Sequence, residues 1–144
     1  MSRQIVLRVI AKLFIPFIVL FALYVQFHGD FGPGGGFQAG VIFAAAIVLF
    51  SLVWGTERSK AVVSPGLLQV AMAVGVLVYG GTGVAALLLG GNFLDYNVLA
   101  ADPVHGQHLG IFLVELGVGV TVAAVMILIF YCFATWRPHA TDQP

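Results

Sequence analysis

The stretch from Leu109 to Phe133, LGIFLVELGVGVTVAAVMILIFYCF, runs for 25 residues with a single charged side chain, Glu115. A helix of about 20 apolar residues is long enough to cross the hydrocarbon core of a bilayer, which is roughly 30 Å thick. Transmembrane barrel strands alternate apolar and polar residues, whereas this run is apolar at odd and even positions alike. The stretch therefore predicts a membrane-spanning helix.

Three further apolar runs precede it, over residues 5–27, 37–54 and 67–89. The second is the shortest, with 18 residues, and is expected to cross with little tilt. The first exceeds the apolar core of a signal peptide, about 7 to 15 residues, so we expect it to be retained. Together the four runs predict an all-α membrane protein with four transmembrane helices, in one membrane domain over residues 1–144.

The composition of the whole chain agrees with a membrane protein. Hydrophobic residues make up 60% and charged residues 8%, with a mean hydropathy of +1.05, whereas soluble domains carry about 25% charged residues. Six basic residues offset six acidic ones, so no basic surface is available to neutralise nucleic-acid phosphates, and nucleic-acid binding is excluded. His105 and His108 are three apart, but no third or fourth ligand accompanies them. We predict no metal and no cofactor.

The basic residues indicate how the chain is oriented. All six lie in the segments that four spans would place on one side, namely the N-terminal segment (Arg3, Arg8, Lys12), the loop 55–66 (Arg58, Lys60) and the tail (Arg137). The loops 28–36 and 90–108 contain no Lys or Arg. Cytoplasmic segments are enriched in basic residues, so we predict that both termini are cytoplasmic. The loop 55–66 is expected to be a solvated connector.

The first loop, HGDFGPGGGFQAG over residues 28–40, is unusual. Its five glycines and one proline within eight residues predict a tight, non-helical turn between two helices. Because Gly34 to Gly36 directly precede the second helix, their N–H groups could accept an anion at its positive end. No Lys-Ser/Thr pair follows, so a nucleotide-binding loop is not supported. A simple turn leaves unexplained the two titratable residues beside it, His28 and Asp30.

The pattern Gly-x-x-x-Pro-Gly-Gly-Gly-Phe over residues 29–37 resembles the signature of the B subunit of Mrp-type multisubunit sodium/proton antiporters, the MnhB family. The chain length and the four-helix plan are also similar to that family. Many members have His directly after the first Gly, where this chain has Asp30. The signature loop comprises His28, Gly29, Asp30, Gly32, Pro33, Gly34, Gly35, Gly36 and Phe37.

The resemblance implies an accessory subunit rather than an enzyme. Its partners would be large antiporter-like subunits, related to the membrane arm of respiratory complex I, and further small subunits in a bacterial or archaeal cell membrane. The subunit would support assembly and line part of the path of sodium and protons. B-like subunits also occur in membrane-bound hydrogenases, so a subunit of a redox-driven ion pump is the alternative.

Two other classes are weaker. A stand-alone homo-oligomeric channel would have few intramembrane polar groups from which to build a pathway. A small membrane enzyme with His28 and Asp30 as acid and base would lack a nucleophile, a metal set and a recognisable substrate site. We therefore predict no catalytic and no cofactor-binding residue.

Glu115 is the candidate intramembrane ion or proton site, together with His108. A carboxylate within an apolar run is costly unless it faces protein or water. His108 lies seven residues earlier, two helical turns away on the same face, and could link Glu115 to the outer surface through water. A proton or sodium relay and an interhelical hydrogen bond that fixes packing both remain open.

Two expectations concern other intramembrane residues. The cluster of residues 80–83, Gly-Gly-Thr-Gly, could locally unwind the third helix, as in transporters with broken helices. Gln26, at the end of the first run, is expected to lie at the membrane interface.

Overall fold

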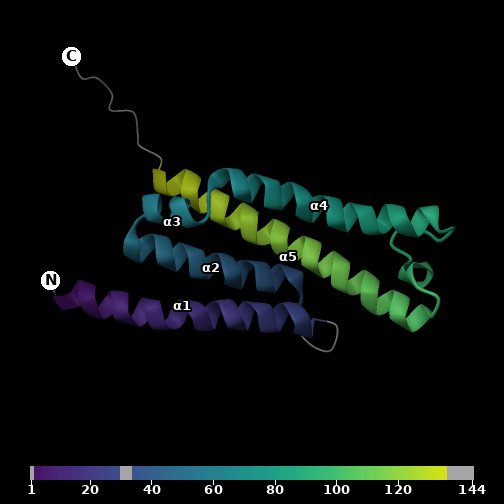
Figure 1. Cartoon of the computed structure of the whole chain (residues 1–144), viewed down its shortest axis with the longest axis horizontal. Coiled ribbons are helices and arrows are strands. Elements are labelled where there is room, and N and C mark those ends of the chain that lie inside the picture. The colour runs from purple at the N-terminus through teal and green to yellow at the C-terminus, as the bar shows by residue number, and fades with distance from the viewer. Residues whose placement is uncertain (1, 30–33, 136–144) are drawn as a thin grey trace, which may run out of the picture.

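A computed structural model of the chain describes residues 2–29 and 34–135, with side chains from residue 5 onward. Every regular element in these ranges is a helix. The elements are α1 (Ser2–His28), α2 (Gly36–Trp54), α3 (Thr56–Val62), α4 (Pro65–Leu88), the short 3-10 helix η1 (Tyr96–Leu99) and α5 (Pro103–Thr135) (Figure 1). Of these, α1, α2, α4 and α5 are long and apolar enough to cross a membrane. The prediction of an all-α chain with four candidate spans is confirmed.

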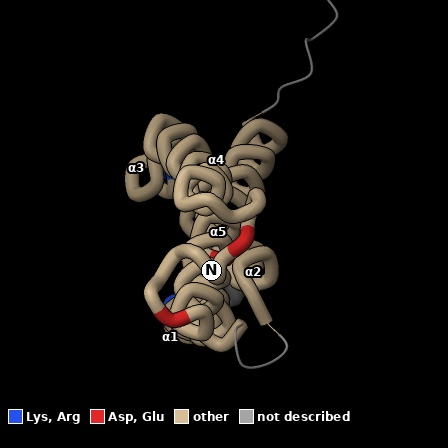
Figure 2. Tube along the Cα trace, turned by 90° about the vertical axis from the view of Figure 1, so that its right-hand side faces the viewer, with Lys and Arg blue, Asp and Glu red and all other residues tan. Residues whose placement is uncertain are grey.

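The four long helices form a row rather than a closed bundle. α5 packs against both α2 and α4, and α1 packs along α2 (Figures 1 and 2). Each helix therefore leaves broad faces uncovered by the chain itself. Only 11% of the most apolar stretch of α1, and 22% of those of α4 and α5, is buried. Lipid or other membrane proteins must cover the remainder, because an apolar helix face is not stable in water.

Small residues allow the central helix to approach its neighbours closely. A Cβ atom added at Gly40 of α2 would lie 2.6 Å from the carbonyl oxygen of Gly119 on α5. On the other side of α5, a Cβ atom added at Gly117 would lie 2.7 Å from the carbonyl oxygen of Gly75 on α4. Glycine at such positions permits direct contact between helix backbones in a membrane.

α5 begins six residues before the apolar run that predicted it. It contains 33 residues and is about 50 Å long at roughly 1.5 Å per residue, which exceeds the membrane core. A helix can extend past the end of its apolar run into water. The first turns of α5 do so, and they contain the polar residues of the segment 103–108. α4 begins where the sequence suggests: Ser64 is its N-cap and accepts a hydrogen bond from Leu67 N, with Pro65 in the first turn.

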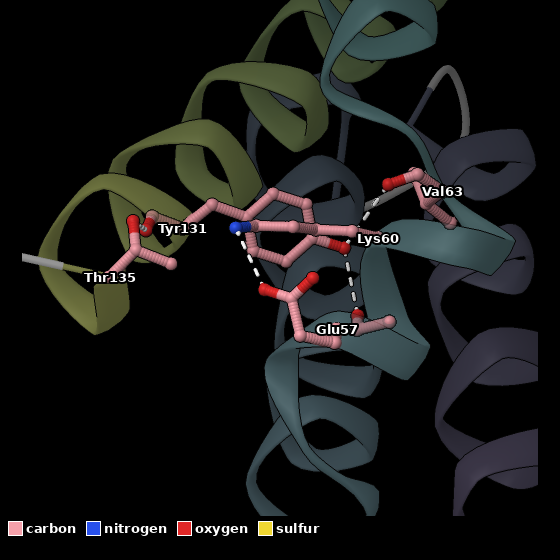
Figure 3. Close-up of polar contacts among 6 residues, drawn as sticks. Glu57, Lys60, Val63, Tyr131 and Thr135 are labelled. Atoms are coloured by element: carbon pink, nitrogen blue, oxygen red, sulfur yellow. Dashed lines mark hydrogen bonds and ion pairs between the residues drawn. The ribbon is translucent and has the colours of Figure 1, made fainter.

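The segment 55–66 is not simply a solvated connector, and that expectation is wrong. It contains α3, whose Ser59 is completely buried. Tyr131 of α5 donates a hydrogen bond to the carbonyl oxygen of Val63 at 3.2 Å, and its hydroxyl oxygen lies 2.8 Å from Ser59 Oγ (Figure 3). Because the tyrosine proton is used at Val63, Ser59 is the donor to Tyr131. This pair of bonds fastens α3 to the end of α5.

The expected unwinding at residues 80–83 is also wrong, because α4 is continuous through them. Thr82 Oγ1 donates to the carbonyl oxygen of Val78 at 2.8 Å, one turn earlier, as a threonine within a helix commonly does. Gly83 instead makes room for the ring of Phe93. Within the cluster, Gly83 is thus a packing position on a regular helix, whereas nothing among the described residues lies within 4 Å of a Cβ atom added at Gly80 or Gly81.

Candidate functional site

The candidate site is the turn between α1 and α2, where it meets α5. α1 ends at His28, and Gly34 and Gly35 lead into α2. Gly35 has φ 125° and ψ 174°, a backbone conformation that residues with a Cβ rarely adopt. Asp30, Gly32 and Pro33 of the signature lie outside the described residues. The described part of the turn therefore requires glycine at least at position 35.

The carboxylate of Glu115 lies against this turn. A Cβ atom added at Gly29 would lie 2.6 Å from Oε1 of Glu115 and closer still to Oε2. One added at Gly35 would lie 3.0 Å from the same Oε1. The carboxylate thus occupies space that is open because neither residue has a side chain. Two features that are distant in sequence, the glycine signature and the intramembrane acid, form one site.

The backbone of α5 crosses the first turn of α2 at the same place. A Cβ atom at Gly36 would collide with the carbonyl oxygen of Glu115 and would lie 2.9 Å from the nitrogen of Gly119. The first N–H groups of a helix have no partner within it, and the helix dipole favours negative charge at that end. The Glu115 carboxylate is therefore next to the positive end of α2, where the sequence suggested that an anion could be accepted.

The other candidate residues lie around this centre. His28 is half-buried, and its ring stacks on Tyr24 with centroids 5.1 Å apart. Phe37 is exposed in the first turn of α2. His108 is exposed in the first turns of α5, and one unbroken helix connects it to Glu115. The turn and Glu115 are thus brought together, whereas His108 lies farther along α5.

Comparison with known proteins identifies the family. Residues 6–128 match the model described as a domain related to the MnhB subunit of Na⁺/H⁺ antiporter. The chain belongs to the MnhB family. Antiporter subunits named mnhB2 from Staphylococcus aureus strains Newman and JH1 are each 34% identical to it over 139 residues, which is 94% of this chain and 98% of theirs.

Membership of the MnhB family confirms the resemblance that we inferred from the glycine signature. The family comprises subunits of a transporter rather than enzymes. The word subunit in the names of the relatives implies further subunits beside this one. The bacterial relatives and the four candidate spans indicate a protein of the cell membrane.

Gln26 is a residue of this MnhB chain whose position sequence reasoning missed. Its side chain is only 8% exposed, and its Oε1 lies against Gly119, one helical turn after Glu115. Its Nε2 is buried and has no hydrogen-bond partner among the described residues. The amide at the end of an apolar run was the available signal, but a single sequence does not indicate that α1 meets α5 at this level.

The segment between α4 and α5 is fastened to the far end of α5. The ring of Tyr96 packs on Gly110, and Gln107 Nε2 donates to Asn97 Oδ1 at 3.0 Å. Burial, followed by the charge of Tyr79, raises the pKa of Tyr96.

The histidines at this end show no metal-binding arrangement. His105 Nδ1 is 3.3 Å from Asp102 Oδ2, an exposed pair that is ionic when the histidine is protonated. Among the residues described, no group of three or more His, Cys, Asp or Glu is arranged to hold a metal ion.

Proposed function

We propose that this subunit of an Na⁺/H⁺ antiporter has two roles that meet at Glu115. The glycine turn fixes α5 against α2 and so supports assembly of the complex. The carboxylate lines part of the ion path, where it binds and releases a proton or a sodium ion. The observation that supports both roles is the position of the carboxylate in the space that Gly29 and Gly35 leave open.

The physical argument starts from the cost of the carboxylate. An ionised group within an apolar span is destabilising unless it serves a pathway or is stabilised by its surroundings. The first turn of α2 supplies part of that stabilisation through its N–H groups and dipole. In this proposal the stabilised carboxylate exchanges a proton or a cation inside the membrane. Such a group suits transient occupation by a cation.

The path itself is expected to continue into other subunits. The row of helices leaves wide apolar faces for neighbours, and Glu115 is the one acidic residue within the four candidate spans of the described chain. His108, two turns closer to the N-terminal end of α5, would pass protons between Glu115 and the outer surface. In this proposal both termini are cytoplasmic, as the distribution of basic residues indicates.

The test replaces Glu115 with Gln, which keeps the size and hydrogen-bonding capacity of the side chain but removes its charge. In the complete complex, Glu115→Gln should slow sodium-dependent proton exchange or shift its pH profile, while the assembled amount stays close to wild type. Glu57→Gln is the matched control, because the Glu57 side chain is 86% exposed, outside the long helices.

Exchange should be measured in vesicles matched for complex content, from neutral to alkaline pH. Glu115→Ala should additionally lower the assembled amount, because it removes the hydrogen-bonding groups of the side chain and leaves a void. Equal exchange by wild type and Glu115→Gln across the range would leave Glu115 with a packing role alone.

A further inference from the structure

One face of the helix row is hollowed by a groove of about 410 Å³. All four long helices contribute to it. Its floor includes Gly40 of α2, with Gly119 and Ala123 of α5, while Leu23 and Gln26 of α1 and Ala71 of α4 lie at its sides. We refer to this feature as the α5 groove.

The shape of the α5 groove suits a helix. Its lining residues on α5 run from Leu116 to Ile127, a length of about 16 Å at roughly 1.5 Å per residue. On the central helices α2 and α5, five of its nine lining residues are glycine or alanine, which allow a second helix to approach closely when both lie in a membrane.

Gln26 gives the α5 groove a polar requirement. The side chain is more than nine-tenths buried, its head lies against Gly119 on the floor, and Nε2 has no partner among the described residues. An amide N–H without an acceptor is costly in an apolar setting. A lipid acyl chain has no acceptor along its length, whereas a helix can offer a backbone carbonyl or a polar side chain.

We propose that the α5 groove is the docking site for a transmembrane helix of another subunit of the antiporter. That helix packs small residues on the floor and offers a hydrogen-bond acceptor, which Gln26 Nε2, closed off in the chain alone, reaches when its amide turns toward the groove. The inference rests on the proposed role of the chain in assembly, and the relatives' names imply that other subunits exist. It does not depend on ion binding by Glu115, although the docked helix would lie one turn from that residue.

The first test fills the groove. Ala71→Phe places a ring in the groove, whereas Ala73→Phe adds the same ring two residues away at an exposed position that does not line it. Each variant is expressed with all other subunits and purified in mild detergent through a tag on this chain. Ala71→Phe should recover several-fold less of the other subunits than Ala73→Phe. Gln26→Leu, which removes the donor at similar volume, should lower recovery less strongly.

The second test does not depend on a variant that fills the α5 groove. A photo-crosslinking residue replaces Leu23, which is 44% exposed beside Gln26, in the intact complex. The expected product joins this chain to a transmembrane helix of one other subunit, identified by mass spectrometry. Products with lipid alone, or with a second copy of this chain, would overturn the proposal.

Equal recovery of the complex from Ala71→Phe and Ala73→Phe would also overturn it. These outcomes are separable from those at Glu115. A complex that assembles normally with a filled groove removes the docking proposal alone, whereas an intact complex in which Glu115→Gln exchanges normally removes the ion-path proposal alone.

Discussion

At the scale of single residues, the glycines of the signature have different tasks. The three nearest atoms to a Cβ added at Gly29 all belong to the Glu115 carboxylate, which is the mobile end of a side chain. At Gly36 the nearest atoms are backbone atoms of α5, which cannot move unless the helices separate. At Gly35 the backbone conformation itself demands glycine. Gly29 therefore makes room for the carboxylate alone, Gly35 for the carboxylate and the turn, and Gly36 for the close approach of α5.

This difference predicts opposite phenotypes for two alanine substitutions. Gly29→Ala should displace the Glu115 carboxylate and alter exchange as Glu115→Gln does, with near-normal recovery of the complex. Gly36→Ala should instead lower recovery by forcing α2 from α5. Gly80→Ala is the control, because nothing lies within 4 Å of a Cβ added there, and it should leave both properties near wild type. Similar losses of recovery for the Gly29 and Gly36 variants would contradict the assignment.

The sequence predicted both parts of this site but not their contact. The glycine signature stands out because five glycines and a proline lie within eight residues, and Glu115 stands out because ionisable residues are rare in a transmembrane run. Their meeting depends on which helices pair and at what level, and small residues occur on α2, α4 and α5 alike. Gln26 was missed for the same reason, since its burial is produced by α5 and not by its own run.

At the scale of elements, the long helices were predictable and α3 was not. Each span is defined by its own apolar composition, so no knowledge of its neighbours is needed. α3 has the sequence TERSKAV, which is charged and too short to be stable alone. Its position depends on the bonds from Tyr131 to Ser59 and Val63, which are tertiary contacts. The first turns of α5 were not predicted, because the change from polar to apolar residues marks where the membrane begins and not where the helix begins.

The Tyr131 contacts predict the effect of removing one oxygen atom. Tyr131→Phe leaves the buried hydroxyl of Ser59 and the carbonyl of Val63 without their partner, at a cost of about 1 kcal/mol. We expect a lower melting temperature for the purified complex. Tyr24→Phe is the matched control, because Tyr24 is 58% exposed, and it should melt like wild type. Equal melting of the Tyr131 and Tyr24 variants would show that α3 is held by packing alone.

At the scale of the whole molecule, the row has two chemically different ends. The start of α1, all of α3 and the end of α5 lie at one end, whereas the segment between α4 and α5 lies at the other (Figure 1). Arg58 and Lys60 belong to the first end, and Asp95 and Asp102 to the second. The positive-inside rule predicts that the first end faces the cytoplasm.

Cysteine labelling tests this orientation in intact cells. The native Cys132 is exposed and is first replaced by alanine. Single cysteines then replace Asn92, exposed at the end of the row that contains Asp95 and Asp102, and Glu57, exposed on α3. Position 59 is unsuitable for labelling because Ser59 is buried. An impermeant thiol reagent added outside should label Asn92→Cys directly, and Glu57→Cys only after the membrane is opened. The reverse pattern would place both termini outside. Labelling of both cysteines from outside would place positions 57 and 92 on the same side of the membrane. That result would contradict the prediction that α4 crosses the membrane between them.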